Sequence, residues 1–229
     1  MLRPKKKITK RELKKDTLIT SYMKASSFYE DHKRQISIGI TAVVAVVIAL
    51  TIYFKNQSDN DEIAATKLAA IRTFYDNAQF QQAVEGVPER NIEGLKAIVE
   101  NLGGTRTGDL ARFYLADAYF QLGKYAEAKD AFEDCDPPEA LLEASRLAGI
   151  AACHEALGNH NDAGVYFERA AAKDPTDGTI AEHLNNAARN FAQAGEKERA
   201  LDILKRLKKN YPTTTYGREA ERFISQLSL

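Results

Sequence analysis

The sequence lacks several features that point to other classes of protein. It contains no tryptophan and carries no net charge, and no segment shows the strict alternation of apolar and polar residues that is typical of strands. The lack of such alternation excludes a fold built mainly from β-sheets. The only cysteines are Cys135 and Cys153. In an oxidising compartment they could form a disulfide, but cysteine is also a common small core residue, and we expect two buried free thiols.

Recognisable catalytic arrangements are also missing. The segment CHEALGNH places His154 and His160 six residues apart across a helix end, whereas the zinc-protease pattern needs two histidines four residues apart on one helix. The segment NLGGTRTGDL is rich in glycine but has no Gly-Lys-Ser/Thr ending for phosphate and magnesium, which indicates a loop between repeats. We therefore expect no enzyme activity, no metal and no cofactor. A membrane-bound hydrolase that uses His154 and Glu155 is less favoured than a protein-binding or scaffold function.

Charged residues are absent from one stretch in particular, Ile36 to Phe54, with the sequence ISIGITAVVAVVIALTIYF. As a helix these 19 residues are about 28 Å long, which matches the hydrocarbon core of a bilayer. Eleven of them are Ile, Val, Leu or Phe, so membrane insertion is favourable by about 3 to 7 kcal/mol. A lone strand cannot satisfy its backbone hydrogen bonds in lipid. The sequence therefore predicts a transmembrane helix over residues 36–54.

The charges on the two sides of this run predict its orientation. Residues 1–35 carry 11 Lys and Arg against 4 Asp and Glu, a net charge of +7, and residues 55–229 carry 21 against 28, a net charge of −7. Because basic residues concentrate on the cytoplasmic side, residues 1–35 are expected to form a basic cytoplasmic tail. The long basic region and the lack of a small-residue cleavage site favour an uncleaved anchor over a signal peptide.

The segments that flank the membrane run have separate predictions. Leu18, Tyr22, Phe28 and Tyr29 lie among the lysines of the tail. This composition suits a short helix on an anionic membrane surface or a flexible tail that sets topology, and both remain open. Residues 55–61, KNQSDND, are expected to be a polar juxtamembrane linker. We expect no nucleic-acid partner, because the downstream domain is acidic.

Residues 62–229 are rich in alanine, and their apolar residues recur at three- and four-residue spacing, which predicts helices. Three segments share one skeleton, in which a glycine ends the first helix, an alanine follows five residues later and a bulky apolar residue four residues after that. The three sets are Gly123, Ala128 and Phe132; Gly158, Ala163 and Phe167; and Gly195, Ala200 and Leu204. The distances between equivalent glycines are 35 and 37 residues.

Packing gives these positions a physical reason. The first-helix alanines are expected to face the second-helix alanines, so that the two antiparallel helices approach closely, and a larger residue one turn later fills the remaining volume. The first-helix alanines are Ala116, Ala151 and Ala188, and the larger residues are Tyr119, His154 and Phe191. Pro175 and Pro212 are expected to end the second helices of the later two copies, because proline has no N–H to continue a helix.

At these residues the sequence resembles the tetratricopeptide repeat (TPR). The resemblance implies an all-α, TPR-like solenoid of helical hairpins, preceded by the single transmembrane helix. Its parts are expected as a degenerate repeat over residues 62–105, repeats over 109–143, 144–177 and 181–214, and a capping helix over 216–227, since terminal repeats of a solenoid are atypical. The degenerate repeat is expected to consist of one long helix, DEIAATKLAAIRTFYDNAQFQQAV, and a second helix, NIEGLKAIVENLGGT. The sequence departs from the repeat pattern at the position of the first-helix tryptophan, which is Arg112, Leu147 and Leu184 in the three copies.

The complete arrangement of basic tail, single anchor and TPR-like domain resembles the YfgM-like family of bacterial inner-membrane proteins. The resemblance implies an inner-membrane (plasma-membrane) location with a cytoplasmic N-terminus and a periplasmic C-terminal domain. It also implies association with the SecYEG translocon and a chaperone-type role on emerging polypeptides. Expected partners are translocon subunits, periplasmic chaperones or secreted polypeptides, and a homo-oligomer is also open. The alternative function is a structural scaffold that tethers an outer-membrane or cell-wall assembly.

Candidate binding residues follow from the geometry of such repeats, whose first helices line the concave face of the solenoid. The first-helix residues that the core does not use are Phe113, Asp117, Phe120, Gln121, Glu155, Asn185, Arg189 and Gln193. Phe113 and Phe120 lie two helical turns apart on one stripe and suit either partner binding or packing on the preceding repeat. Arg189 with Asn185 suits either a bound carboxylate or carbonyl, or a solvated surface pair.

Overall fold

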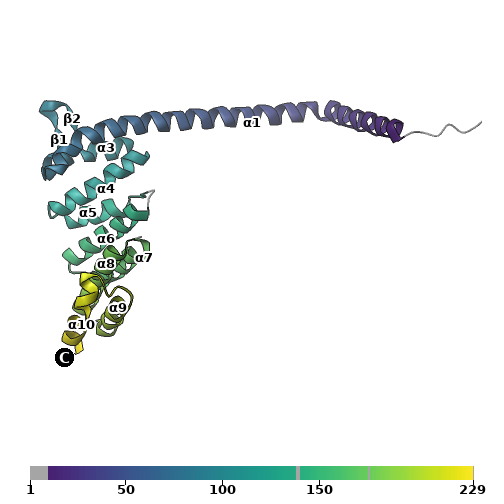
Figure 1. Ribbon diagram of the computed structural model, residues 1–229. Coiled ribbons are helices and arrows are strands. Elements are labelled where there is room, and N and C mark those ends of the chain that lie inside the picture. Colours follow the sequence, from purple (N-terminus) through teal and green to yellow (C-terminus); the bar gives the residue numbers. More distant parts are fainter. Residues whose placement is uncertain (1–9, 138–139, 175, 229) are drawn as a thin grey trace, which may run out of the picture. The chain divides into compact units, whose positions relative to one another are not determined.

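The computed structural model describes residues 10–137, 140–174 and 176–228. Pro175 and the first nine residues of the basic tail lie outside the described residues. The chain divides into two compact units, Met1–Asn56 and Gln57–Leu229, which we describe separately (Figure 1). Helix α1, Lys10–Asp76, contributes to both units.

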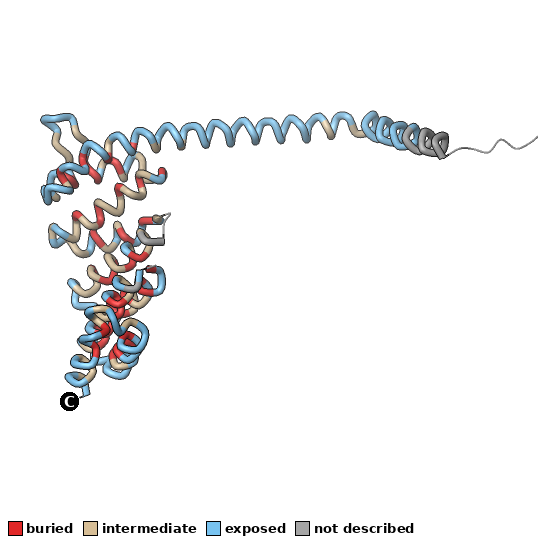
Figure 2. Tube along the Cα trace, viewed as in Figure 1, coloured by how far each residue is buried: buried red, intermediate tan, exposed pale blue. Residues whose placement is uncertain are grey.

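The first unit consists, in its described part, of the N-terminal portion of α1. This helix is long and apolar enough to cross a membrane, with a mean hydropathy of 2.5 in an 18-residue window of which no residue is buried (Figure 2). The hydroxyls of Thr41 and Thr51 donate hydrogen bonds to the backbone carbonyls of Ser37 and Val47, 2.9 and 2.8 Å away. Polar atoms that are satisfied within the helix lower the cost of placing it in lipid.

The second unit is a series of short antiparallel helices. Residues 55–61, expected as a linker, are helical and continue α1. The elements that follow α1 are α2 (Phe80–Glu85), β1 (Gly86–Val87), the 3-10 helix η1 (Pro88–Arg90), β2 (Ile92–Glu93), α3 (Leu95–Leu102), α4 (Arg106–Gln121), α5 (Tyr125–Glu133), α6 (Ala140–Ala156), α7 (His160–Lys173), α8 (Asp177–Gln193), α9 (Lys197–Asn210) and α10 (Thr215–Ser228). The pairs α4–α5, α6–α7 and α8–α9 overlap the repeats expected over 109–143, 144–177 and 181–214, although α4 and α6 begin at Arg106 and Ala140, and α10 overlaps the segment expected as a cap. These results confirm the all-α, TPR-like fold.

The three glycine turns are built identically. Gly123, Gly158 and Gly195 have φ angles of 74°, 79° and 82°, a left-handed conformation that glycine adopts without strain. In each turn the N–H after the glycine donates to a carbonyl five residues earlier, as from Lys124 to Tyr119 at 2.9 Å. This Schellman motif ends the first helix and starts the second.

A fourth turn of the same kind separates α1 from α2, where the sequence predicts one uninterrupted helix over DEIAATKLAAIRTFYDNAQFQQAV. That prediction is wrong, because α1 ends at Asp76 and Ala78 adopts a left-handed φ of 57°. The N–H of Gln79 donates to the carbonyl of Phe74 at 2.9 Å, which matches the bonds of the glycine turns. The end of α1 and α2 therefore form the first helical hairpin.

A small β-ribbon follows this hairpin and was not expected from the sequence. Strands β1 and β2 pair antiparallel, with Gly86 opposite Glu93 and Val87 opposite Ile92. The Nζ of Lys67 lies 2.7 Å from Oε1 of Glu93, which links the ribbon to α1. Two-residue strands are too short to produce a recognisable alternation of polar and apolar residues.

The core runs along the helix pairs as three groups of buried residues. Buried positions are coloured red along the Cα trace in Figure 2. The alanines predicted at the hairpin contacts are all fully buried: Ala116, Ala128, Ala151, Ala163, Ala188 and Ala200. The bulky apolar residues of the repeat skeleton, Phe132, Phe167 and Leu204, are also buried. His154 lies in its predicted packing position, stacked on Tyr166 with 5.4 Å between ring centroids. Small residues at these contacts allow the close helix approach that the sequence predicts.

Candidate protein-binding surfaces

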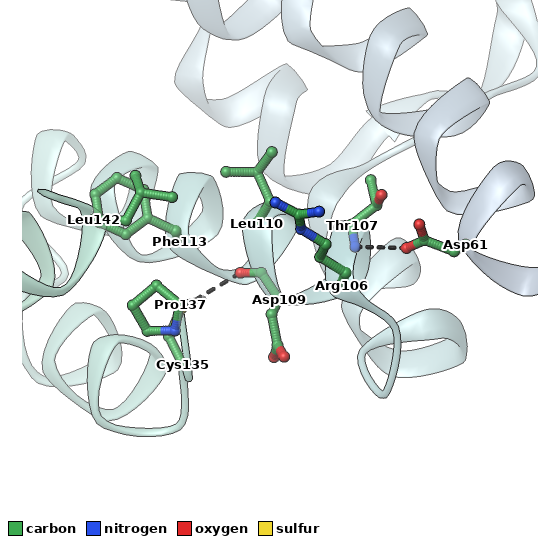
Figure 3. A pocket seen from close by; sticks show the side chains of 9 residues that line it. All are labelled: Asp61, Arg106, Thr107, Asp109, Leu110, Phe113, Cys135, Pro137 and Leu142. Atoms are coloured by element: carbon green, nitrogen blue, oxygen red, sulfur yellow. Dashed lines mark hydrogen bonds between the residues drawn. The ribbon is translucent and has the colours of Figure 1, made fainter. Parts of the chain in front are cut away.

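One pocket, which we call the Phe113 pocket, opens between α1, α4, the segment after α5 and the start of α6 (Figure 3). Its volume is about 320 Å³. The lining residues are Asp61, Arg106, Thr107, Asp109, Leu110, Phe113, Cys135, Pro137 and Leu142. Figure 3 shows apolar side chains gathered at one end, around Phe113 and Leu142, and a polar end at Asp61 and Thr107.

The polar end of the Phe113 pocket is fixed by the start of α4. The side chain of Thr105 caps this helix by accepting a hydrogen bond from the N–H of Gly108 at 2.9 Å. The N–H of Thr107 donates to Oδ1 of Asp61 at 2.7 Å, so a carboxylate of α1 satisfies another free backbone donor of the helix N-terminus. The contact of Asp61 with Thr107 joins α1 to the start of α4 beside the pocket.

The middle of the Phe113 pocket is polar but internally satisfied. Nη1 of Arg112 lies 3.1 Å from Oδ1 of Asp109 and donates to the carbonyl of Asp134 at 2.7 Å. Burial raises the pKa of Asp109, and Arg112 partly opposes this effect. The Sγ of Cys135 donates to the carbonyl of Asp109 at 3.4 Å, and burial raises the pKa of this thiol to about 11. Cys135 is therefore a protonated wall residue and not a nucleophile at neutral pH.

The two predicted aromatic residues of α4 both pack inside the domain. The ring of Phe113 lies 5.5 Å from that of Phe132, and the ring of Phe120 lies 5.3 Å from that of Tyr125. Both residues pack against the buried group formed by their own hairpin and by Ile150 and Cys153 of α6, and not on the preceding repeat that the packing alternative proposed. Phe113 also lines the Phe113 pocket, and Phe120 does not.

Asp117 occupies a contact between hairpins, and Gln121 lies beside it on α4. The hydroxyl of Tyr75, in α1, donates to Oδ2 of Asp117 at 2.5 Å. Burial, followed by this hydrogen bond to Asp117, raises the pKa of Tyr75, so the hydroxyl stays a donor at physiological pH. Gln121 is exposed, and its Nε2 lies 3.5 Å from Oδ1 of Asp117. Asp117 is therefore already engaged by the first hairpin.

A polar network joins α6, α7 and α8. Nη2 of Arg189 donates to Oε1 of Glu155 at 2.7 Å, and Nδ2 of the fully buried Asn190 donates to Oε2 of Glu155 at 3.1 Å. The other amide atom of Asn190, Oδ1, lies 3.0 Å from Nδ1 of His160. Because this oxygen can only accept, His160 carries its proton on Nδ1. One of the sequence alternatives was a bound carboxylate at Arg189. In the structure Glu155 of the protein itself supplies a carboxylate to one edge of this guanidinium.

The remaining predicted residues lie near the C-terminal end of the domain. Asn185 and Arg189 line a second pocket of about 210 Å³ between α8 and α10, which we call the α8–α10 pocket. Its other lining residues are Glu219, Arg222, Phe223 and Gln226. Gln193 is exposed beside the turn that joins α6 and α7. The eight predicted residues therefore fall in several places, and Phe113 and Asn185 lie in different pockets.

Sequence reasoning missed the residues that complete each pocket. Leu110, Pro137 and Leu142 build the apolar end of the first, and Arg222 and Phe223 contribute from α10 to the second. A signal for the second group exists in the segment YGREAERFISQL, where an Arg, a Phe and a Gln recur at helical spacing on the predicted cap. Both cysteines are free thiols. Within the described residues, no group of His, Cys, Asp and Glu could hold a metal ion.

Comparisons with known proteins agree with this architecture. The sequence pattern of the tetratricopeptide repeat matches residues 110–135 and 186–214. The fold is similar to crystal structures of the nearly identical TPR-like repeats of a Podospora anserina protein described as a putative kinesin light chain. One structure has 15% sequence identity and a TM-score of 0.55, and covers 73% of this chain and 86% of its own. A point variant of the same protein has 15% sequence identity and a TM-score of 0.54, and the match covers 73% of this chain and 85% of the variant.

No curated protein matches the sequence. At 15% identity the structural likeness concerns the fold alone. The repeat match adds that two of the hairpins, α4–α5 and α8–α9, have the sequence pattern as well as the shape of the tetratricopeptide repeat. No catalytic family is matched, and repeats of this type typically act as scaffolds for protein–protein interaction. The protein therefore contains TPR repeats within an all-α, TPR-like domain, and it carries a candidate membrane-spanning helix.

Proposed function

We propose that this protein is a single-pass membrane protein whose TPR-like domain binds polypeptide partners outside the cytoplasm, as an ancillary factor of the secretory translocon and its periplasmic chaperones. The Phe113 pocket is the observation that carries the binding proposal. It combines an apolar end with a polar end, and an apolar pocket with a few polar groups is the usual form of a binding site.

The membrane part of the proposal is supported by composition and charge. Residues 36–54 carry no charge, and the two flanking segments have net charges of +7 and −7. The charge asymmetry favours a cytoplasmic N-terminus. The location at a translocon rests on the resemblance of the complete arrangement to the YfgM-like family.

The test is site-specific photocrosslinking in intact membranes, with p-benzoylphenylalanine in place of Phe113. This residue retains an aromatic ring beside the pocket, and its benzophenone reaches a bound partner. We expect crosslinks to translocon subunits, periplasmic chaperones or secreted polypeptides. The matched control places the same residue at Phe120, which is also on α4 but packs against Tyr125 and lines none of the pockets described.

Each outcome of this experiment discriminates. Crosslinks from Phe113 to components of an outer-membrane or cell-wall assembly would support the scaffold alternative instead. Equal crosslinking from Phe113 and Phe120 would show that the pocket does not select the partner. If position 113 crosslinked to no protein in membranes where the domain is folded and inserted, the binding proposal would be wrong.

A further inference from the structure

The part of α1 that precedes the membrane run carries a cluster of exposed apolar side chains. Every residue from 19 to 31 is helical and exposed (Figure 2, pale blue). The large apolar residues of this segment are Ile19, Tyr22, Met23, Phe28 and Tyr29. In the described part of the second unit, the exposed large apolar residues are Ile63 and Leu157, which lie far apart in the sequence. Scattered apolar residues are normal on a protein surface, but a cluster of them indicates a covering partner.

Helical spacing places three of these residues on one stripe. Ile19, Tyr22 and Tyr29 follow one another at intervals of three and seven residues, so they lie on the same side of the helix. We call these three residues the tail stripe. Their exposed fractions are 56%, 75% and 54%. Lys24 and Asp31 project from the opposite side, because they lie about half a turn away from the stripe. The segment is therefore an amphipathic helix with an uncovered apolar side.

The tail stripe lies in a strongly basic part of the chain. Residues 1–35 carry 11 Lys and Arg against 4 Asp and Glu. Cations stand at both ends of the stripe, with Lys14 and Lys15 before it and Lys33 and Arg34 after it. Among the described residues, Lys33 pairs with Glu30 at 2.9 Å, and Arg34 has no carboxylate partner. Orientation of a membrane span needs only the cations, so the apolar stripe calls for a separate explanation.

The connection to the membrane run keeps the tail stripe close to a bilayer. Tyr29 precedes Ile36 by seven residues, which is about 10 Å of helix, and the headgroup layer of a bilayer is about 5 to 7 Å thick. For the stripe to lie along the surface, α1 must bend between the stripe and the span. Residues 30–35, EDHKRQ, are polar, and water and headgroups can bond to backbone groups that a bend sets free there.

A second copy of the chain is a poorer cover for the tail stripe than lipid. Two tails that pack side by side bring together two net charges of +7, which repel each other. Anionic lipid headgroups attract the same charges, and the acyl boundary beneath them accepts apolar side chains. Charge and apolar surface therefore favour the same partner.

We propose that residues 19–29 form an interfacial helix that binds the anionic phospholipids of the leaflet on the side of the tail. The tail stripe inserts at the boundary between headgroups and acyl chains, and the cations at its two ends bind the lipid phosphates. Each Lys or Arg near an anionic surface strengthens such binding by about fivefold. The inference rests on the membrane span of the proposed function and adds a second, lipid-selective contact to it.

The test uses the absence of tryptophan from the chain, since one introduced tryptophan then reports on a single position. Tyr22→Trp places this probe on the tail stripe. Ser27→Trp places it on the other side of the same helix as a matched control. Each full-length variant is reconstituted in nanodiscs of phosphatidylcholine alone, or of phosphatidylcholine with about 30% phosphatidylglycerol. Emission and its quenching by acrylamide are measured at low and at high salt, because salt screens attraction to the headgroups.

We expect Tyr22→Trp in the anionic nanodiscs to emit at shorter wavelength and to be quenched about threefold less than in the neutral ones. High salt should reverse this protection, and Ser27→Trp should not show it. Adding Tyr29→Ser to Tyr22→Trp should weaken the protection. Adding Phe28→Ser should leave it unchanged, because Phe28 lies off the stripe and its ring stacks on that of His32, with 4.4 Å between ring centroids.

Several results would contradict the proposal. Equal protection of position 22 in neutral and anionic nanodiscs would mean that a second copy of the chain, and not anionic lipid, covers the stripe. Equal protection at positions 22 and 27, no protection at either, or protection that survives Tyr29→Ser would exclude an inserted stripe. Protein that does not co-elute with the nanodiscs would refute the membrane span itself, and this proposal with it. Failure of the span is thus distinguishable from failure of the lipid contact.

Discussion

At the scale of single residues, His183 is the buried group with the clearest consequence for stability. It is 8% exposed, as is Asp174, and its Nε2 lies 3.5 Å from Oδ2 of Asp174. Its ring stacks on that of Phe167 at 6.4 Å, and its Nδ1 is buried without a hydrogen-bond partner in the described structure. Burial lowers the pKa of His183, and the nearby carboxylates of Asp174 and Glu182 only partly oppose this. The folded domain therefore holds a neutral imidazole.

This predicts that acidification destabilises the domain through His183. Because the folded pKa is lower than the ordinary value of 6.5, the contribution of this group to stability is complete above pH 6.5. It is lost as the pH falls from 6.5 through the folded pKa, since the unfolded protein takes up the proton more readily. We expect the urea concentration at the unfolding midpoint to decrease when the pH is lowered from about 7.5 to about 5.5. The decrease should be smaller in the His183→Gln variant.

The comparison of the two proteins isolates the histidine, because the other titrating groups are the same in both. Absolute stability of the variant is not the readout, since a buried glutamine has its own cost. An identical pH dependence in the two proteins would show that His183 does not titrate differently on folding.

At the scale of elements, the four helix-ending turns offer a matched experiment. Ala78 and Gly158 occupy equivalent left-handed positions, with φ angles of 57° and 79°. A residue with a Cβ pays about 1 kcal/mol or more in this conformation, whereas glycine does not. A Cβ at Gly158 would meet no atom within 4 Å outside Gly158 and its two chain neighbours, so the effect of a substitution there is confined to the local backbone.

We therefore expect opposite effects from exchanging the two residues. Ala78→Gly should raise the free energy of unfolding by about 1 kcal/mol, and Gly158→Ala should lower it by about the same amount. Chemical denaturation followed by circular dichroism measures both. Destabilisation by Ala78→Gly would mean that the methyl group contributes packing that outweighs the backbone strain.

These turns also show how far the sequence predicts the fold. Gly123, Gly158 and Gly195 are visible because glycine is the common residue at a helix C-terminus, and the alanine spacing then identifies the hairpins. The turn at Ala78 was missed because alanine favours helix and no glycine or proline marks the break. The ribbon of β1 and β2 was missed because its strands are too short to have a period.

The candidate sites were less predictable than the fold. The periodicity of α4 placed Phe113 off the hairpin contact, whereas its ring packs against Phe132 of α5, and tertiary structure decides which side of the ring is left facing the pocket. The Phe113 pocket also needs residues from α1 and α6. In the α8–α10 pocket, Arg222 joins Arg189 only because α10 packs beside α8. The residue pattern within one repeat does not show which residues of other helices will pack beside it.

At the scale of the whole molecule, the proposed topology has a direct test. The single candidate span among the described residues and the excess of basic residues before it lead us to expect the C-terminal domain outside the cytoplasm. Protease added to cells with a permeabilised outer envelope should then digest the domain or release it from the membrane. A cytoplasmic marker protein must stay intact in the same sample.

The opposite topology gives a different result. A domain that resists protease until the inner membrane is lysed would place it in the cytoplasm, and the proposed partners in the periplasm would be excluded. Intrinsic resistance of the folded domain is checked with detergent-lysed membranes, where the same protease must digest it.

The shared turn conformation also bears on how the gene can change. Gly123, Gly158 and Gly195 join equivalent helix ends through one backbone geometry, at intervals of 35 and 37 residues. Unequal recombination between two of these points would encode a first helix from one copy and a second helix from another, connected by the same glycine. Because each hairpin contacts mainly its neighbours, a domain of this design can lengthen or shorten by complete units during evolution.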